Sequence, residues 1–264
     1  MTLHPPSSSE PAWAASDLAE NPHLTADKAD RVQRMFGAIA KRYDLNNRIH
    51  SFGRDQAWRR AVVRLAEVKP TDHVLDVACG TGDLSQAFAD APGGVASVTG
   101  LDFTAAMLDL AREKARRRAA ANRSGLHPIY IQGDAMALPF EDGSFDVVSI
   151  AFGIRNVAQP ARALAEFRRV LRPGGRVVIL EFSTPPNPLI RWFNRLYCER
   201  LMPITATLIA RDRSGAYRYL PRSVSTFMNQ TQMEQALREA RFDRIRTKPM
   251  TLGVCTAYLG FTSA

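Results

Sequence analysis

Glycines and acidic residues follow three short apolar runs of the sequence, in a pattern that suits ligand binding. Glycine lets a backbone approach a ligand closely, and a helix that starts after a glycine turn offers free N–H groups. If the runs are parallel strands, the residues that follow them meet at one edge of a sheet, where open α/β sheets bind ligands. The candidate binding residues are Asp76, Gly80, Thr81, Gly82, Asp102, Phe103, Asp134 and Ala135.

The residues around the glycine turn narrow the class of ligand. Ser85 stands where a dinucleotide fingerprint has its third glycine, and the carboxylates of Asp76 and Asp83 would repel a pyrophosphate. An acidic residue at the end of a second strand, here Asp102, suits the hydroxyls of a ribose, and Asp134 suits an adenine amino group. A nucleoside with a positive centre and no phosphate, such as S-adenosylmethionine, fits better than NAD or ATP. Turn capping by Asp76 or Asp134 is the structural alternative.

Short apolar runs alternate with stretches of helical periodicity, and these elements must position the binding residues. Such alternation indicates an α/β fold with a parallel sheet and helices on both of its faces. Pro173-Gly174-Gly175 is expected to end one helix and turn the chain into the next strand. The predicted strands are 73–78, 95–101, 128–132, 145–152, 176–182, 244–249 and 252–261, and the predicted helices are 83–90, 104–120, 160–171 and 231–240.

Three segments lie outside that alternation. Residues 1–27 are rich in Pro, Ser and Ala and are predicted to form a flexible N-terminal tail, with Trp13 as its only bulky anchor. Residues 28–68 have helical periodicity, interrupted by Tyr-Asp-Leu-Asn-Asn at 43–47, and are predicted to form a helical lid. Residues 184–229 combine prolines and aromatic residues with seven arginines, and are expected to be an insertion over the substrate site.

Composition excludes several classes of protein. A length of 264 residues, with 45% hydrophobic and 23% charged residues, is typical of one globular domain, predicted over residues 28–264. The three cysteines and five histidines lack the spacing of disulfide frameworks or metal sites, so no metal is expected. No membrane-spanning run and no signal pattern are found, which predicts a cytoplasmic protein. A net charge of +9 suits nucleic acid, an anionic membrane surface or an acidic small molecule.

Several motifs together resemble a known family. DVACGTGD, GLD, GDA, LPFEDGSFD and RVLRPGG are similar to those of class I S-adenosylmethionine-dependent methyltransferases. YDLNNRIHSFGRDQAW at 43–58, AFGIRNV at 151–157 and LEFS at 180–183 resemble more narrowly the UbiE/MenG/Coq5 quinone-methyltransferase family, over about residues 30–261. The resemblance implies a class I methyltransferase Rossmann-like fold: a mostly parallel seven-stranded sheet with helices on both faces and an N-terminal helical lid.

The resemblance also implies a reaction. Members of the family methylate a ring carbon of a prenylated quinol, with S-adenosyl-L-methionine as the methyl donor. The YDLNN…SFGRD segment favours the conversion of demethylmenaquinol to menaquinol, and methylation of 2-polyprenyl-6-methoxy-1,4-benzoquinol in ubiquinone biosynthesis is the alternative. An RNA methyltransferase is a more distant alternative, because FGIRN stands where an NPPY-type or cysteine-nucleophile motif would be.

The family's site residues can be carried over by position. The resemblance implies cofactor contacts from Thr81, Asp102, Asp134 and Ala135, all already singled out by the pattern of strand ends. A further family contact is often a serine before Phe-Gly, and here that position holds Ala151, which leaves a backbone contact.

Methyl transfer to a quinol carbon requires that a hydroxyl proton be taken or that the phenolate be stabilised. Arg155 and Asn156, after the fourth predicted strand, are expected to face the methyl donor. An always-charged arginine suits phenolate stabilisation better than proton transfer, and Asn156 suits orientation of the hydroxyl. Tyr43 and Asp44 of the lid are further candidates, with Asp44 as a possible proton acceptor. Alternatives are a structural ion pair for Arg155 and helix packing for Tyr43.

A prenylated quinol resides in the lipid bilayer, so its enzyme must meet a membrane. The arginines of 184–229 are interleaved with Trp192, Phe193, Leu196 and Tyr197, which is typical of a membrane interface. We therefore expect a cytoplasmic protein that can sit peripherally at the inner face of an anionic membrane, without a nucleic-acid partner. An apolar lid would also allow a homodimer.

Overall fold

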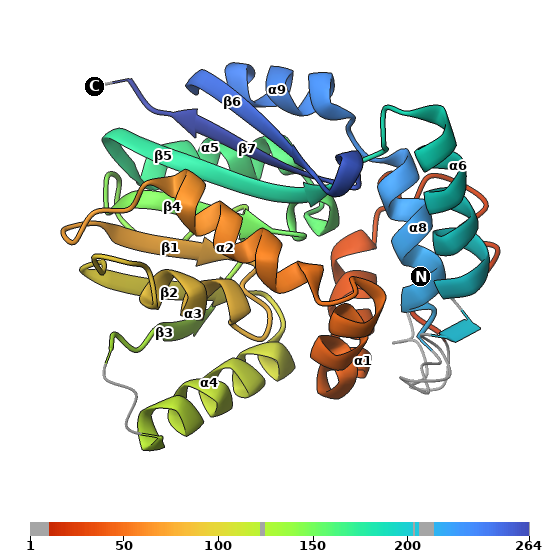
Figure 1. The fold of residues 1–264 in the computed structure, drawn as a ribbon, viewed down its shortest axis with the longest axis horizontal. Helices are drawn as coiled ribbons and strands as arrows, with labels where there is room; N and C mark the ends of the chain where they lie inside the picture. The colour runs from red at the N-terminus through yellow and green to blue at the C-terminus, as the bar shows by residue number, and fades with distance from the viewer. Residues whose placement is uncertain (1–10, 122–124, 203, 206–213, 264) are drawn as a thin grey trace, which may run out of the picture.

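The computed structural model describes residues 11–121, 125–202, 204–205 and 214–263, which build a seven-stranded sheet (Figure 1). The sheet has the order β3-β2-β1-β4-β5-β7-β6. Strand β7 runs antiparallel to both of its neighbours, and the others are parallel to one another. The strands are β1 (His73–Val77), β2 (Ser97–Asp102), β3 (Ile129–Gln132), β4 (Phe145–Ala151), β5 (Leu171–Phe182), β6 (Asp243–Met250) and β7 (Cys255–Phe261). This confirms the predicted mostly parallel sheet.

The central strands are apolar on both faces, and for this reason they appear in the sequence as continuous hydrophobic runs. In β5, Val177 and Ile179 enter one core cluster while Val178 and Leu180 enter the other, because successive side chains of a strand point to opposite faces. Both faces therefore need a covering layer of helices, and the sheet is buried in the middle of the domain.

Helices supply those two layers (Figure 1). On one face lie α2 (Arg54–Ala66) and α3 (Asp83–Ala89), and on the other α5 (Pro160–Val170) and α9 (Gln230–Glu239). Helix α4 (Ala105–Ala120) packs against β3 and β2 at the sheet edge. Helix α9 begins with a reciprocal cap, in which Asn229 and Gln232 each accept a backbone N–H from the other.

A separate group of helices stands beyond the carboxyl ends of the parallel strands, at the right of Figure 1. It consists of α1 (Lys28–His50), α6 (Pro188–Leu196), the π-helical turn η2 (Tyr197–Leu201) and α8 (Ala216–Thr226). Strand ends and this helical group therefore face one another, and any ligand of the strand ends must lie between them. Arg211 and Arg213 of the predicted insertion lie outside the described residues.

The N-terminal segment differs from the predicted flexible tail over residues 11–27. Trp13 is fully buried and stacks on Tyr219 of α8, with ring centroids 4.6 Å apart. Its backbone N–H donates to the carbonyl of Ser214 at 3.0 Å, and His23 Nε2 lies 2.8 Å from the carbonyl oxygen of Ser223. Burial of one large aromatic side chain outweighs a composition that favours disorder. Residues 1–10 of the predicted tail lie outside the described residues.

Helix α1 corrects a second prediction, because it continues through the expected interruption at 43–47. Asn46 is buried there and donates to the Tyr217 hydroxyl of α8 at 2.5 Å. Tertiary contacts of this kind override the weak helix propensity of Asn and Asp. The predicted lid of 28–68 also divides into two parts. Helix α2 covers a face of the sheet, and α1 stands over the strand ends.

Two element boundaries differ from the predicted ones. Helix α5 ends at Val170, before Pro173-Gly174-Gly175, and these residues already belong to β5. The last strand begins at Cys255 instead of 252, because Thr251–Gly253 form a single 3₁₀ turn, η3.

Candidate active site

A small cavity of about 110 Å³ lies between α1 and the ends of the first four strands. Asp102 after β2, Asp134 after β3 and Ala151 at the end of β4 contribute to its wall, together with Gly80 of the glycine turn. Among the described residues that line this cavity, the charged ones are Asp102 and Asp134. The cavity therefore offers carboxylates and apolar surface, which suits a cationic ligand and disfavours a phosphate.

Asp102 is held rigidly at the centre of this wall. Its Oδ2 accepts the Gly80 backbone N–H at 2.7 Å, and its Oδ1 accepts the Thr104 N–H at 2.8 Å. The carboxylate is buried, and this burial raises its pKa. The side chain thus ties the glycine turn to the end of β2, while it also faces the cavity.

The other predicted cofactor residues divide into two groups. Phe103, Asp134, Ala135 and Ala151 line the small cavity with Gly80 and Asp102, and Asp134 also caps a turn by accepting the Met136 N–H at 2.9 Å. Asp76, Thr81 and Gly82 do not line it, within the residues that the structure describes.

Asp76 and Gly82 lie behind the turn and shape it. Asp76 is fully buried and accepts hydroxyl hydrogen bonds from Ser85 at 2.6 Å and Ser149 at 2.9 Å, and its burial raises its pKa to about 6. Gly82 has a φ of +82°, and a Cβ there would overlap the Tyr130 hydroxyl. These contacts give Asp76 a structural role, although not that of a turn cap, because its carboxylate joins Ser85 of α3 to Ser149 of β4 through their hydroxyl groups.

A second, larger cavity of about 650 Å³ lies between α1, α2, α6 and α8. Its wall is rich in aromatic side chains, and Arg155 of the short helix η1 (Ile154–Asn156) also reaches it. Its size falls in the ordinary range of small-molecule sites. The aromatic wall residues include Phe36, Tyr43, Trp58, Phe152, Phe182 and Tyr219.

The two cavities meet, since Phe36, Tyr43 and Phe152 line both of them. Phe152 has a φ of +58°, an unfavourable conformation for a bulky residue, and its backbone groups are tightly held. Its carbonyl accepts hydrogen bonds from Arg155 Nη1 at 2.8 Å and Asn156 Nδ2 at 3.2 Å. A molecule in each cavity would therefore contact the same three aromatic side chains.

Arg155 and Asn156 are placed on either side of this junction. Asn156 lines the small cavity and accepts the Tyr219 hydroxyl at 3.0 Å. Arg155 lines the large cavity, but its guanidinium forms a buried ion pair with Glu181 at 2.6 Å. Arg155 thus forms a structural ion pair, which was the alternative to a site role, and it also lines the large cavity.

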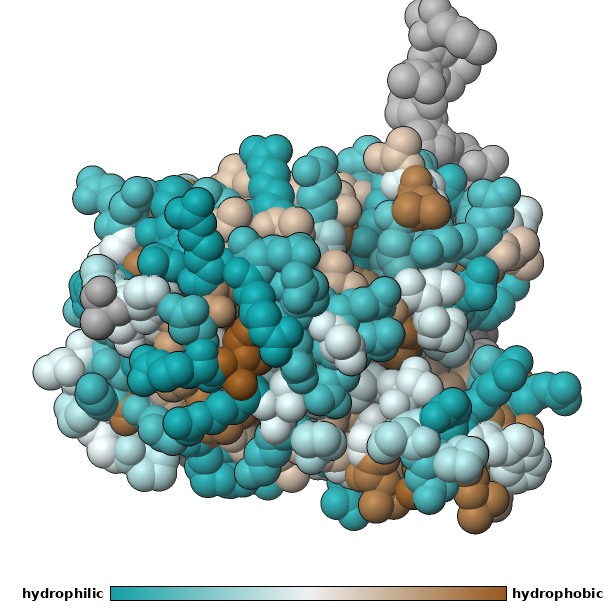
Figure 2. Space-filling view, turned by 90° about the horizontal axis from the view of Figure 1, so that it is seen from above, coloured by the Kyte–Doolittle hydropathy of each residue, from teal (hydrophilic) through white to brown (hydrophobic). Residues whose placement is uncertain are grey.

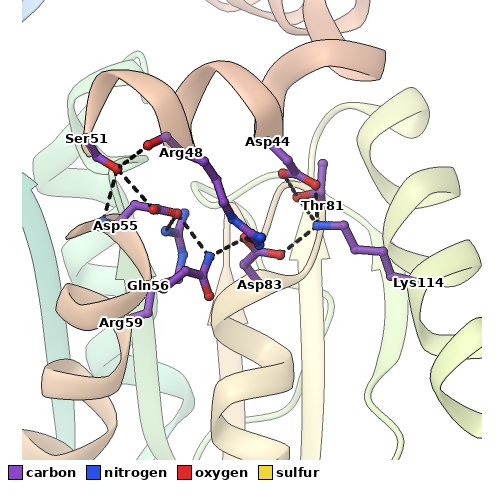
Figure 3. A network of polar contacts seen from close by, with 9 residues as sticks. All are labelled: Asp44, Arg48, Ser51, Asp55, Gln56, Arg59, Thr81, Asp83 and Lys114. Carbon is purple, nitrogen blue, oxygen red and sulfur yellow. Dashed lines mark hydrogen bonds and ion pairs between the residues drawn. The ribbon is translucent and has the colours of Figure 1, made fainter. Parts of the chain in front are cut away.

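Asp44 lies away from both cavities, in a network of polar contacts shown in Figure 3. Its carboxylate pairs with Lys114 Nζ of α4 at 2.5 Å and accepts the Thr81 hydroxyl at 2.6 Å. Lys114 also pairs with Asp83 at 2.6 Å. These contacts fasten α1 to the glycine turn and to α4, so they place Asp44 where it holds the lid, and not where it would meet a ligand of the large cavity.

Sequence reasoning missed several residues of both walls. Phe36 and Phe152, which line both cavities, were not predicted as site residues, and neither was Glu181, which pairs with Arg155 behind the wall. Asp55 and Arg59, which form a buried ion pair at 2.9 Å in the wall of the large cavity, were not singled out either. Their spacing of four on a helix was the available signal.

Within the described parts of the chain, no helix is long and apolar enough to cross a membrane. The same residues contain no group of three or more His, Cys, Asp or Glu side chains placed to hold a metal ion.

Solved structures share this fold. The [4+2]-cyclase SpnF matches with a TM-score of 0.64 at 16% identity, over 89% of this chain and 96% of that one. An S-adenosylmethionine-dependent methyltransferase of Thermotoga maritima, described as a possible histamine N-methyltransferase, matches with a TM-score of 0.60 at 16% identity, over 87% and 99%. At such identities the likeness concerns the fold.

Comparisons of amino-acid sequence find relatives of much higher identity. The demethylmenaquinone methyltransferase of Thermus thermophilus is 45% identical over 86% of this chain and 99% of its own length, and that of Deinococcus radiodurans is 42% identical over 92% and 98%. The ubiquinone/menaquinone biosynthesis C-methyltransferase UbiE of Geotalea daltonii is 39% identical over 89% and 97%. The ubiE/COQ5 methyltransferase family matches residues 24–262. This chain is therefore a member of the ubiE/COQ5 methyltransferase family.

Proposed function

We propose that the protein transfers the methyl group of S-adenosylmethionine to a ring carbon of demethylmenaquinol, giving menaquinol. The observation that carries this proposal is the pair of cavities that meet at Phe36, Tyr43 and Phe152. Relatives in which the chain covers almost the whole length are named demethylmenaquinone methyltransferases, which supports this substrate.

The wall of the small cavity offers the chemical groups that the methyl donor needs. Asp102 is positioned to accept hydrogen bonds from ribose hydroxyls and Asp134 from an adenine amino group. Phe103 and Ala135 would contact the base, and Ala151 would offer its backbone. When bound, the donor supplies an already activated methyl group on a positively charged sulfur, which the acidic wall favours.

The large cavity fits an aromatic ring system and the first part of an apolar tail. Tyr43, at the junction, would position the ring against the donor, and Asn156 would orient a hydroxyl. Arg155 would place positive charge near the developing phenolate, with Glu181 fixing its guanidinium. Alignment of two substrates in adjoining cavities can lower a barrier by several kcal/mol, roughly 7–11 at most.

A label-transfer assay tests this function. Purified protein would be incubated with S-adenosylmethionine labelled in its methyl group and, in separate reactions, with short-chain demethylmenaquinol, the prenylated methoxybenzoquinol and tRNA. We expect label in the naphthoquinol. Label in the benzoquinol alone would move the substrate to the ubiquinone series, and label in tRNA alone would refute quinol methylation.

We also propose that α6 docks on an anionic lipid surface. Arg191, Asn194 and Arg195 lie on the face of α6 that lines the large cavity. The opposite face exposes Leu189, Trp192, Phe193 and Leu196, each between 47% and 63% accessible. In Figure 2, hydrophobic side chains at the right-hand end of the molecule, where Figure 1 shows α1, α6 and α8, lie among hydrophilic ones. Aromatic side chains beside arginines suit the headgroup region, and a prenyl tail could enter there.

Vesicle cosedimentation tests the docking surface. The protein is expected to bind vesicles that contain phosphatidylglycerol better than pure phosphatidylcholine, and less well at high salt. Replacing Trp192 and Phe193 with serine should weaken binding at least about tenfold, since each buried aromatic side chain contributes roughly 1.5–3 kcal/mol. Equal binding by this variant would refute the role of α6.

A further inference from the structure

Asp55 and Arg59 form a buried ion pair in the wall of the large cavity. They lie one turn apart on α2, with Arg59 Nη1 2.9 Å from Asp55 Oδ2, and they are 4% and 7% accessible. Both side chains line the cavity. Burying two charges costs several kcal/mol per ion, of the order described for interior ion pairs, so a pair in a cavity wall invites a functional explanation.

A second buried ion pair beside this cavity, that of Arg155 and Glu181, differs in its position relative to the wall. Arg155 reaches the cavity, but its partner Glu181 is not among the described residues that line it. Glu181 lies behind the wall, where it also accepts the Phe182 backbone N–H at 2.8 Å. Of these two buried pairs, the pair of Asp55 and Arg59 has both of its members in the wall of the cavity.

Arg59 also extends toward the junction with the small cavity. The carbon at the centre of its guanidinium lies 5.7 Å from the centroid of the Phe152 ring, and Phe152 lines both cavities. Among the described residues, the hydrogen bond that this guanidinium donates runs to Asp55. Four further N–H groups belong to the same guanidinium, which has five donors in all.

The wall of the large cavity contains two carboxylates and one imidazole that could serve as a base: Asp55, Glu199 and His50. Glu199 is paired with Arg195 at 3.0 Å on the exposed side of the helical group. His50 Nδ1 lies 3.0 Å from the Tyr197 hydroxyl, whereas its Nε2 is buried without a hydrogen-bond partner among the described residues, so His50 is the competing acceptor that the experiment must separate from Asp55. Of these three groups, Asp55 is the one whose ion-pair partner, Arg59, extends toward Phe152 at the junction of the two cavities.

We propose that Asp55 accepts the hydroxyl proton of the quinol and that Arg59 then stabilises the phenolate oxygen. This inference rests on the proposed quinol methylation. The carboxylate of Asp55 has about four lone-pair sites. Ser51, Gln56 and Arg59 occupy three of them, at 3.0, 3.0 and 2.9 Å, which leaves one for the hydroxyl.

The atoms balance in this sequence of steps. The O–H bond breaks, its proton goes to Asp55, and its electron pair makes the ring carbon nucleophilic. The ring carbon forms a bond to the sulfonium methyl while the carbon–sulfur bond breaks, leaving a neutral thioether. The methylated carbon then loses its hydrogen to water as a proton, and the oxygen regains the proton from Asp55. The net result is one methyl group transferred and one proton released.

The charge also balances at each stage. Protonation of Asp55 removes the counter-ion of Arg59 at the moment when negative charge appears on the substrate oxygen. The guanidinium can then donate a charge-assisted hydrogen bond to that oxygen, without leaving a buried cation unpaired.

Steady-state kinetics of three variants test this role in the quinol assay. Asp55→Asn should lower kcat about 100-fold or more, the usual contribution of a general base, while the Kd for S-adenosylhomocysteine stays within about twofold. Asp55→His should regain part of kcat, with the acidic limb of its pH profile moved toward about 6.5. His50→Gln, the variant of the competing acceptor, should keep a larger share of kcat than Asp55→Asn, because the ring of His50 contacts Tyr197 of η2 and not Arg59.

The results distinguish a failure of the proposed quinol methylation from a failure of the proposed role of Asp55. If the unaltered protein does not methylate the quinol, the proposed function fails. If it does and Asp55→Asn keeps its kcat, or if Asp55→His leaves the pH profile unchanged, Asp55 is not the acceptor. Loss of kcat in His50→Gln with retention in Asp55→Asn would assign that role to His50. Thermal melting identifies any variant that fails to fold, and the remaining Asp55 variant then decides.

Discussion

The Asp44 carboxylate of α1 lies 2.5 Å from the Lys114 ammonium nitrogen of α4. Lys114 also reaches Asp83 at the start of α3 and donates to the Thr81 hydroxyl at 2.9 Å. One ammonium group thus joins the lid helix to the glycine turn (Figure 3). We expect a ligand beneath α1 to be retained more firmly while these contacts hold.

Lys114→Met should therefore weaken cofactor binding. Both ion pairs are partly exposed, and such pairs contribute roughly 0.2–1 kcal/mol each, so the Kd for S-adenosylhomocysteine should rise about three- to tenfold. Calorimetric titration measures this change, and added salt should raise the Kd of the unaltered protein in the same direction. Arg117→Met is the matched control, because Arg117 pairs with Glu113 on the exposed side of α4. Equal Kd values for all three proteins would contradict the role of Lys114.

Asp102→Asn should disrupt the glycine turn and the ribose contact together. Each carboxylate oxygen now accepts a backbone N–H, from Gly80 and Thr104, whereas an asparagine has one acceptor oxygen and an NH₂ group that would face a donor. An unpaired N–H costs about 1–3 kcal/mol, so affinity for S-adenosylhomocysteine should fall at least about tenfold. Asp109→Asn, on the exposed side of α4, is expected to bind normally. Normal binding by Asp102→Asn would refute its place in the site.

Trp13→Ala should destabilise the whole domain, although the residue lies near the N-terminus. Its ring is fully buried against Tyr219, and truncation of a buried aromatic side chain costs about 3–5 kcal/mol. Urea unfolding should show this loss, while Trp192→Ala, at 57% exposure, should stay within about 0.5 kcal/mol. A similar stability for both variants would mean that the N-terminal segment does not pack in solution. Because Tyr219 donates to Asn156, kcat should fall as well.

The stability of the protein should also depend on the ionisation of Asp76. Burial raises its pKa to about 6 in the folded state, above an unfolded value near 4. The folded chain therefore binds this proton more tightly, so the contribution to stability is fully present below about pH 4 and is lost as the pH rises through about 6. Relative to Asp76→Asn, the unaltered protein should lose up to about 3 kcal/mol of unfolding free energy across this window. Chemical denaturation of both proteins at several pH values measures the difference, and a constant difference would contradict the shifted pKa.

Much of the fold could be predicted because it follows from local patterns. Apolar runs such as Val74–Val77 report burial on both faces, and the alternation of strands with helices implies a parallel sheet. Once the strands are parallel, Asp102, Asp134 and Ala151 must come together at one edge, and all three line the small cavity. The position of these residues could be predicted because the residue that follows the last residue of a parallel strand lies at the carboxyl edge of the sheet.

Other features depend on contacts between residues far apart in the chain, and only the tertiary structure decided them. Trp13 is an anchor of the fold because Tyr219 lies beside it, and α1 continues through Asn46 because Tyr217 accepts its hydrogen bond. Asp44 holds the lid because Lys114 approaches it from α4. Sequence alone determined which side chains meet at one edge of the sheet. The partner of each charged side chain depends on packing between residues far apart in the chain, which no local pattern encodes.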